Sequence, residues 1–213
     1  MEDSDFKIIK RFGPSVLKVK IPEEIIRSLN DHFEKVINND DESKRLNHGE
    51  DLVGDVSQEL KLENEIMEKS GWVKFLGTNI DKWMKEEIGQ GITNFVMLNS
   101  WIVRQYKNEY NPTHWHNGHI SGAGYLKVPK TLGKHYQEKQ NRDYRGGNLQ
   151  LIHGSRMFLS HSTLNIVPEV GDFYFFPNYL MHTVFPFKDT NEERRCISFN
   201  CKIDDELYNV YGG

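Results

Sequence analysis

The spacing of apolar residues changes from a helical period to a strand period partway along the chain. Before about residue 92, apolar residues recur three or four positions apart, as in Ile25, Leu29 and Phe33, which is the period of an amphipathic helix. From residue 93 onward, short runs rich in Val, Ile, Phe and Tyr alternate with Gly, Pro, Asn and Asp, which is typical of strands joined by turns. The pattern therefore predicts helices first and strands second.

The first part of the chain contains five predicted segments. Residues 12–20 predict a short opening strand, and a helix follows from Pro22, because the fixed φ of proline suits the first helical position. Residues 38–58 are rich in Asn, Asp, Gly and Ser and predict an exposed loop. A helix of uncertain start then leads into a clearer one over 72–88, which Gly89 ends.

The whole pattern indicates an α+β chain that is mainly β. Many short strands preceded by helices favour a core of two packed sheets, a β-sandwich or jelly roll. We expect a single domain over residues 1–213, in which residues 1–92 are mainly helical and pack on one outer face of the sandwich. Residues 93–203 are expected to form the core, interrupted by a polar loop over 130–145.

Composition and charge exclude several classes of protein. The net charge of the 213 residues is −4 and no long basic run is present, so neither nucleic acid nor an anionic membrane is the expected partner. No apolar run approaches the roughly 18 residues that span a bilayer, and the first residues lack the apolar segment of a signal peptide. Cys196 and Cys201 are expected on opposite faces of one strand, which makes a disulfide between them implausible. A reducing cytoplasm is the expected compartment.

Three of the nine histidines fall within six residues, at His114, His116 and His119. On an extended segment His114 and His116 point to the same side, so that their imidazoles can bind one metal ion. A third candidate ligand, His182, lies between two aromatic-rich runs that we interpret as strands. A His-x-His pair is also common on polar loops, and imidazole binds iron, zinc and copper alike. The histidines alone therefore leave both the site and its metal open.

Arg194 begins the last predicted strand, where it shares a face with Cys196 and Ser198. An arginine buried beside a metal cavity needs an anion, because an unpaired buried charge is strongly unfavourable. A dicarboxylate that chelates the metal at one end could supply that anion at its other end. Tyr125 could add a hydroxyl group to the same carboxylate. We therefore take Arg194, Tyr125 and Ser198 as candidate residues for binding this ligand.

Two other interpretations of this strand stay open. Arg194 could instead lie on the surface and pair with Glu192 or Glu193. If the register of the strand differs by one residue, Arg195 and not Arg194 faces the cavity.

Four segments, in this order, resemble the 2-oxoglutarate- and Fe(II)-dependent oxygenases: HWHNGHISGAGYLKVP, GGNLQL, VGDFYFFPNYLMHTVFPF and ERRCISFN. The resemblance covers roughly residues 93–203. It looks closest to a branch of oxygenases found in bacteria and tailed phages, whose core pattern is similar to that of the prolyl hydroxylases. The resemblance implies a double-stranded β-helix, which is a form of jelly roll, with Fe(II) as metal and 2-oxoglutarate and O₂ as co-substrates.

The resemblance also implies roles for individual residues. The metal in this family is held by His-x-Asp and a distal His, and these positions correspond here to His114, His116 and His182. Arg194 matches the arginine that binds the far carboxylate of 2-oxoglutarate, and Tyr125 matches the tyrosine on the strand after the metal motif.

The chain departs from the family pattern at one position, where His116 replaces the aspartate. Phage-type relatives also carry a histidine there, so this departure is compatible with the resemblance. The replacement makes the site more similar to the three-histidine sites of cupins. It leaves open whether His116, His119 or a water molecule is the third ligand.

The function implied by the resemblance is hydroxylation of a C–H bond, coupled to conversion of 2-oxoglutarate to succinate and CO₂. A peptidyl residue such as proline is the leading substrate, and a small molecule is the alternative. The loop over 130–145 could close over either one. The compartment implied is the cytoplasm of a bacterium or of a phage-infected cell. A cupin-like metalloenzyme without 2-oxoglutarate, or a non-catalytic jelly-roll binding module, stays possible.

Overall fold

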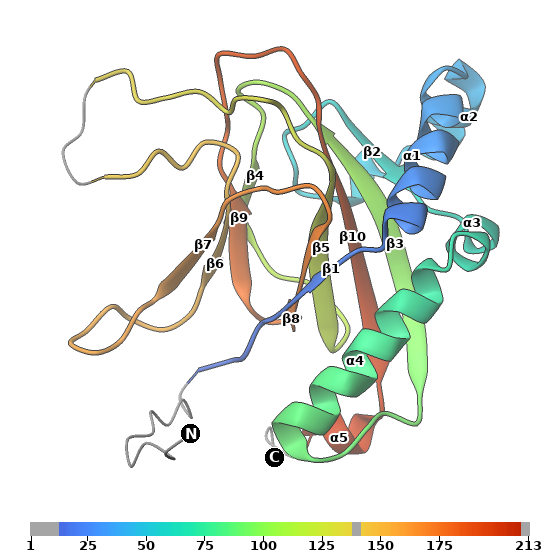
Figure 1. Ribbon diagram of the computed structural model, residues 1–213, viewed down its shortest axis with the longest axis vertical. Helices are drawn as coiled ribbons and strands as arrows, with labels where there is room; N and C mark the ends of the chain where they lie inside the picture. Colours follow the sequence, from blue (N-terminus) through green and yellow to red (C-terminus); the bar gives the residue numbers. More distant parts are fainter. Residues whose placement is uncertain (1–12, 138–141, 210–213) are drawn as a thin grey trace, which may run out of the picture.

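The structure of the protein is a computed structural model that describes residues 13–137 and 142–209 (Figure 1). Its helices are α1 (Glu23–Ile37), α2 (Asp40–Arg45), a 3₁₀ turn η1 (Gly49–Asp51), α3 (Asn64–Lys69), α4 (Trp72–Ile88) and α5 (Asp205–Asn209). Its strands are β1 (Leu17–Lys20), β2 (Gln58–Lys61), β3 (Phe95–Gln105), β4 (Asn111–His114), β5 (Ile120–Lys127), β6 (Leu149–Ile152), β7 (Thr163–Ile166), β8 (Asp172–Pro177), β9 (Met181–Val184) and β10 (Arg194–Ile203).

The strands form two antiparallel sheets. The large sheet has six strands in the order β1-β8-β5-β10-β3-β2, and the small sheet has four in the order β4-β9-β6-β7. Every strand pair within them is antiparallel. In Figure 1 the helices α1 to α4 lie on one side of the large sheet, and the small sheet lies on the other. The prediction of a mainly β chain with supporting helices is therefore confirmed.

The helices cover the outer face of the large sheet because their apolar stripes match it. In α1 the fully buried residues Leu29 and Phe33 lie one turn apart, as expected for an amphipathic helix. In α4 the side chain of Trp72 is fully buried and meets the edge of the Phe173 ring of β8 at 5.2 Å between centroids. This apolar layer fixes the large sheet, so that its opposite face can carry a polar cavity.

The inner face of the large sheet is defined by the register of its strands. On β10, Cys196 lies opposite Tyr125 of β5 and opposite Val103 of β3. Val103 in turn lies opposite Glu59 of β2. Because directly opposed residues in antiparallel strands point to the same face, these four side chains all point toward the small sheet.

Most elements predicted from local patterns lie where expected, but one prediction was wrong. The helix over 72–88 is α4, and its ends at Gly71 and Gly89 both have positive φ, a conformation that glycine adopts without strain. Residues 38–58, predicted as a loop, contain the helix α2. The side chain of Asn39 accepts hydrogen bonds from the backbone N–H of residues 41 and 42, which is the N-cap arrangement that stabilises a helix start.

Two features of the prediction can be compared with the structure only in part. The polar loop over 130–145 connects β5 and β6, and residues 138–141 within it lie outside the described residues. None of its described residues lines the cavity that lies between the two sheets. The first residues of the chain, predicted to lack a signal peptide, also lie outside the described range. Within that range, no helix is long and apolar enough to cross a membrane.

Candidate functional site

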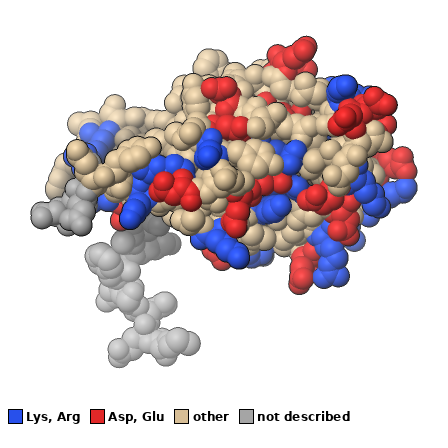
Figure 2. All heavy atoms as spheres, turned by 90° about the horizontal axis from the view of Figure 1, so that it is seen from above, with Lys and Arg blue, Asp and Glu red and all other residues tan. Residues whose placement is uncertain are grey.

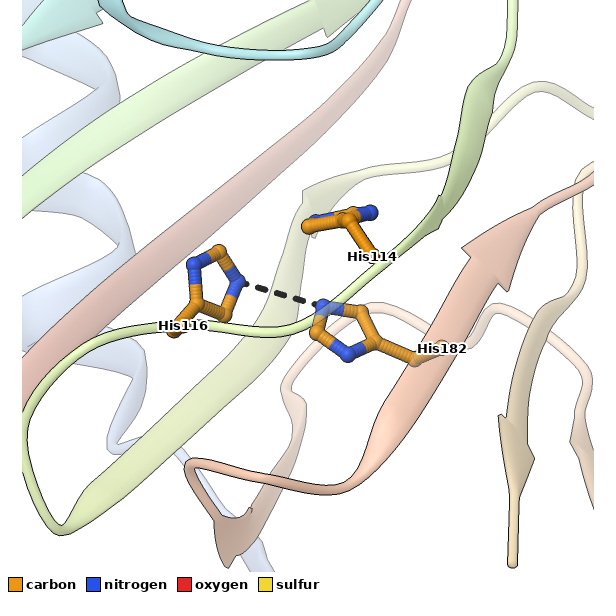
Figure 3. A group of neighbouring side chains, drawn as sticks. All are labelled: His114, His116 and His182. Carbon is orange, nitrogen blue, oxygen red and sulfur yellow. Dashed lines mark hydrogen bonds between the residues drawn. The ribbon is translucent and has the colours of Figure 1, made fainter.

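Three histidines lie together at the small sheet (Figure 3). His114 is the last residue of β4 and lies directly opposite His182 of β9. His116 follows on the loop after β4, where its backbone N–H donates to the carbonyl of Asn178 at 3.0 Å. The side-chain amide of Asn178 donates in return to the carbonyl of His116 at 3.1 Å. These two hydrogen bonds fix the third histidine beside the sheet.

The three imidazoles can bind one metal ion. One ring nitrogen from each lies within 4.8 Å of the other two, and Nε2 of His116 lies 3.1 Å from Nε2 of His182. Nδ1 of His114 donates to the carbonyl of Pro112 at 2.7 Å, and Nδ1 of His182 to that of Leu180 at 2.9 Å. A hydrogen bond at Nδ1 leaves Nε2 as the free ligand atom and fixes the orientation of the ring.

Burial keeps these histidines in the neutral form that a metal requires. Desolvation is the main cause that lowers the pKa of His182 to about 3 and that of His116 to about 4. Desolvation also lowers the pKa of His114. Neighbouring imidazoles add to the shift at His116 and His182. A divalent first-row metal ion therefore fits this group, both in its donor atoms and in its charge state.

His119, the alternative third ligand, lies elsewhere. Gly118 has a φ of 98° and turns the chain into β5, and a side chain at this glycine would meet the carbonyl oxygen of Cys201 at 2.7 Å. The His119 ring stacks on Tyr208 at 3.9 Å between centroids, and its Nδ1 accepts a hydrogen bond from the backbone N–H of Ile203. The structure thus brings His116, and not His119, to His114 and His182.

A cavity of about 270 Å³ lies between the histidines and the inner face of the large sheet. All three histidines line it, together with Arg194 and Ser198 of β10. Cys196 of β10 lines the same cavity. The prediction that Arg194, Cys196 and Ser198 share one face of this strand is thereby confirmed. The two sheets consequently contribute different groups: the small sheet brings imidazoles, and the large sheet brings the arginine.

Arg194 is buried without a counter-ion. Its residue exposure is 2%, and its Nη1 donates to the amide oxygen of Gln105 at 2.8 Å. Its Nε has no hydrogen-bond partner in the part of the chain that the structure describes, and no described carboxylate forms an ion pair with it. On the face shown in Figure 2, by contrast, acidic and basic side chains are interspersed, so exposed charges there lie among charges of opposite sign. The interpretation of Arg194 as a surface residue paired with a glutamate was wrong.

Tyr125 lies beside this arginine. The guanidinium carbon of Arg194 is 5.1 Å from the centroid of the Tyr125 ring. The tyrosine is fully buried, and its hydroxyl group has no hydrogen-bond partner among residues 13–137 and 142–209. Burial raises the pKa of this hydroxyl, so it stays protonated and can act as a donor. Two unpartnered donors next to each other, one of them cationic, fit a carboxylate.

Arg195 points to the opposite face of β10. It donates to Glu193 at 2.7 Å and to Glu34 of α1 at 2.8 Å, so its charge is balanced within the protein. These ion pairs join β10 to the helix layer. The contacts of Arg195 therefore stabilise the fold, and Arg194 is the arginine that faces the cavity.

The sequence did not identify two polar residues of the site. Gln105, which holds Arg194, is the last residue of β3 and lies directly opposite Arg194 in the register. Glu59 of β2 is 2% exposed and also lines the cavity. Neither residue lies in a recognisable motif, and only knowledge of the strand pairing could have identified them.

Taken together, the fold and the site define a class of protein in which three histidines that can hold a metal ion and an unpaired buried arginine line one cavity between two antiparallel sheets. The comparisons with known proteins agree with the resemblance found in the sequence. A sequence model with the description "Putative 2OG-Fe(II) oxygenase" matches residues 99–200, just under half of the chain. The resemblance to the 2-oxoglutarate- and Fe(II)-dependent oxygenases is thus confirmed, and Fe(II) and 2-oxoglutarate are the cofactors of the class. No curated protein matches the chain in sequence.

Solved structures of such oxygenases share the fold. A prolyl-4-hydroxylase from Pseudomonas putida is 14% identical with a TM-score of 0.57, covering 89% of this chain and 93% of that one. A viral collagen prolyl hydroxylase from Paramecium Bursaria Chlorella virus-1, solved as a 2OG complex, is 14% identical with a TM-score of 0.53, covering 87% and 94%. HygX from Streptomyces hygroscopicus, solved with nickel and 2-oxoglutarate, is 11% identical with a TM-score of 0.54, covering 88% and 81%. At these identities the similarity shows the fold alone.

Proposed function

We propose that the protein is an Fe(II)- and 2-oxoglutarate-dependent oxygenase that hydroxylates a C–H bond of its substrate, with release of succinate and CO₂. A peptidyl residue such as proline is the leading substrate, since two structural neighbours are described as prolyl hydroxylases. We further propose that the chain acts as one oxygenase domain and that its two sheets form the double-stranded β-helix of the class. Residues 93–203 contribute the core, the three histidines and Arg194, and residues 1–92 contribute the helices α1 to α4 and the strands β1 and β2.

The observation that supports this proposal best is the unpaired buried Arg194 in the same cavity as the three histidines. A guanidinium group in this position is strongly destabilising unless an anion binds to it. The far carboxylate of 2-oxoglutarate would accept hydrogen bonds from Arg194 and from the Tyr125 hydroxyl. Ser198, on the same face of β10, lines the same cavity.

The charge of the ligand set also suits a dianion. His114, His116 and His182 are neutral, so a ferrous ion held by them keeps its full double positive charge. One carboxylate of 2-oxoglutarate would offset part of this charge, and the other would offset Arg194. When bound, the ferrous ion supplies the site at which O₂ reacts with 2-oxoglutarate. The protein chain positions the ligands, anchors the co-substrate and excludes water.

The test is thermal unfolding of anaerobic protein with Mn(II), with and without 2-oxoglutarate, for the wild type and Arg194→Met. At a concentration a hundred times the Kd, a ligand stabilises a protein by about 2.7 kcal/mol. For a chain of this size this corresponds to a rise in Tm of roughly 5–10 °C. The rise should require metal and should disappear in Arg194→Met. Arg27→Met, which makes the same change on the exposed face of α1, should keep it.

A second candidate function is a cupin-like metalloenzyme that does not use 2-oxoglutarate. The observation in its favour is that the metal-binding group found in the described residues contains histidines alone. Stabilisation by metal that is unaffected by 2-oxoglutarate and by Arg194→Met would support it and contradict the oxygenase. The absence of any stabilisation by metal would contradict both and favour a non-catalytic binding module.

A further inference from the structure

A buried carboxyl group lies in the cavity wall, away from the groups assigned above. Glu59 is on β2, opposite Val103 of β3, which is opposite Cys196 of β10. Glu59 therefore points to the inner face of the large sheet, and it lines the same cavity as the histidines. It is displaced from Arg194 by two strands and two residues, or roughly 12 Å between Cα atoms.

This carboxyl group has no hydrogen-bond or ion-pair partner among the described residues. Glu59 is 2% exposed, and its Oε2 is buried without a hydrogen-bond partner in the described ranges. Desolvation raises its pKa to about 7. A buried acceptor without a partner is strongly unfavourable, and such groups are frequent where a ligand completes the site.

Glu59 is distinct from the metal centre. The group of described side chains that can hold a metal contains His114, His116 and His182, and no oxygen of Glu59 lies close enough to join them. The carboxylate missing from the His-x-Asp pattern is therefore not supplied by Glu59. Its role must concern another ligand in the cavity.

The charged side chains that line the cavity around Glu59 are mostly acidic. Only three ionisable side chains besides the histidines and Cys196 line the cavity: Asp51, Glu59 and Arg194. Once 2-oxoglutarate offsets Arg194, the charged side chains of the lining that remain, Asp51 and Glu59, are both acidic. Gly54 keeps a side chain away from this carboxyl group, because a Cβ at this position would come within 3.0 Å of Nδ2 of Asn111 and within 3.1 Å of Oε1 of Glu59.

We propose that Glu59 binds a protonated amine or a guanidinium group of the substrate. The proposal rests on the proposed function and narrows its substrate to a molecule that carries a cation, either a basic peptide or a free amine. A charge-assisted hydrogen bond to such a cation satisfies the buried carboxylate. Glu59 is then a specificity-determining residue that touches substrate and takes no part in metal or 2-oxoglutarate binding.

The position of Glu59 places the rest of such a substrate toward the metal centre. Along β3 the next inward residue after Val103 is Trp101, whose indole ring meets the edge of the His116 ring at 5.6 Å between centroids. The wall thus runs from Glu59 past Trp101 to His116. A cation held at Glu59 leaves the aliphatic carbons attached to it along this wall.

The test is isothermal titration of protein loaded with Mn(II) and 2-oxoglutarate. The probes are Nα-acetyl-lysine N-methylamide as the peptidyl arm, n-pentylamine as the free-amine arm and Nα-acetyl-norleucine N-methylamide as the neutral match. The wild type should bind at least one amine, and Glu59→Gln should weaken that binding by about tenfold or more. The arm that binds more tightly identifies the source of the amine.

A matched control separates a specific contact from general charge. Asp51 lines the cavity mouth with a side chain that is 73% exposed, so Asp51→Asn removes the same charge where water screens it. The affinity of the amine should change less than about threefold in this variant. Equal losses in both variants, equal binding of the norleucine probe, or no amine binding at all would overturn the proposal. The stabilisation by Mn(II) and 2-oxoglutarate is measured first, and its failure would instead refute the oxygenase function.

Discussion

Replacing Tyr125 with phenylalanine should make the metal-free protein more stable and the co-substrate complex weaker. In the metal-free protein the Tyr125 hydroxyl is fully buried and has no hydrogen-bond partner among the described residues. A buried hydroxyl group without a partner costs about 1–3 kcal/mol, because its hydrogen bonds to water are lost on folding. Tyr125→Phe removes this cost and retains the ring that packs beside Arg194. We expect the free energy of unfolding to rise by about 1 kcal/mol, or the Tm by roughly 2–4 °C.

The same substitution has the opposite effect when 2-oxoglutarate is present. A hydrogen bond to a carboxylate contributes about 1.5–3 kcal/mol. Its loss should therefore weaken the binding of 2-oxoglutarate by roughly 10-fold to 100-fold. A residue that serves only packing would not change stability and co-substrate affinity in opposite directions.

Two assays test this prediction. Urea unfolding of the metal-free protein gives the stability, and isothermal titration of 2-oxoglutarate into the Mn(II)-loaded protein gives the affinity. Tyr174→Phe is the control, because Tyr174 is also buried on the inner face but donates its hydroxyl proton to Asp172 at 3.3 Å. This control should lower the stability and leave the affinity unchanged. The reasoning is refuted if Tyr125→Phe destabilises the metal-free protein or leaves the affinity of 2-oxoglutarate as it was.

Two further predictions concern charged groups. Arg195→Met should lower the free energy of unfolding by about 3 kcal/mol in urea titrations, because it removes one partner of the buried pair with Glu193. The rise in Tm caused by 2-oxoglutarate should remain, and its loss would mean that Arg195 binds the co-substrate. The metal-free protein should also lose stability as the pH falls from 6.5 to about 4. Burial holds the pKa values of His116 and His182 at about 4 and 3, so over this range the unfolded chain takes up protons that the folded chain does not. In His182→Asn, the free energy of unfolding, measured in urea, should depend less on pH between 6.5 and about 4. An unchanged pH dependence would contradict the lowered pKa of His182.

Local patterns predicted the elements whose structure depends on nearby residues. The helix over 72–88 was predictable because its apolar period and its terminal glycine are both local signals. The orientation of Arg194 was predictable for the same reason, since side chains alternate along any strand. The convergence of His114 with His116 likewise follows from their spacing by two residues.

The remaining parts of the site depend on contacts between distant segments. The sequence QELK of β2 lacks an alternating apolar pattern, and it forms a strand because it pairs with the edge of β3. Glu59 lies just beyond the loop predicted over 38–58, in a stretch where no strand was expected. The support of Arg194 by Gln105 requires the register of β3 against β10. The choice between His116 and His119 was open because both are imidazoles, and it depended on the turn at Gly118.

The position of β10 in the large sheet has a consequence for the synthesis of the chain on the ribosome. β10 lies between β3 and β5, yet it follows every other strand of both sheets along the described chain. Until β10 emerges from the ribosome, β3 and β5 face each other across an empty slot whose edges have unpaired backbone groups. All three histidines have already been translated by then, whereas Arg194 enters with the strand that closes the slot. A nascent chain thus gains its anion pocket in the same step that completes its large sheet, and before that step its open edges are exposed to aggregation.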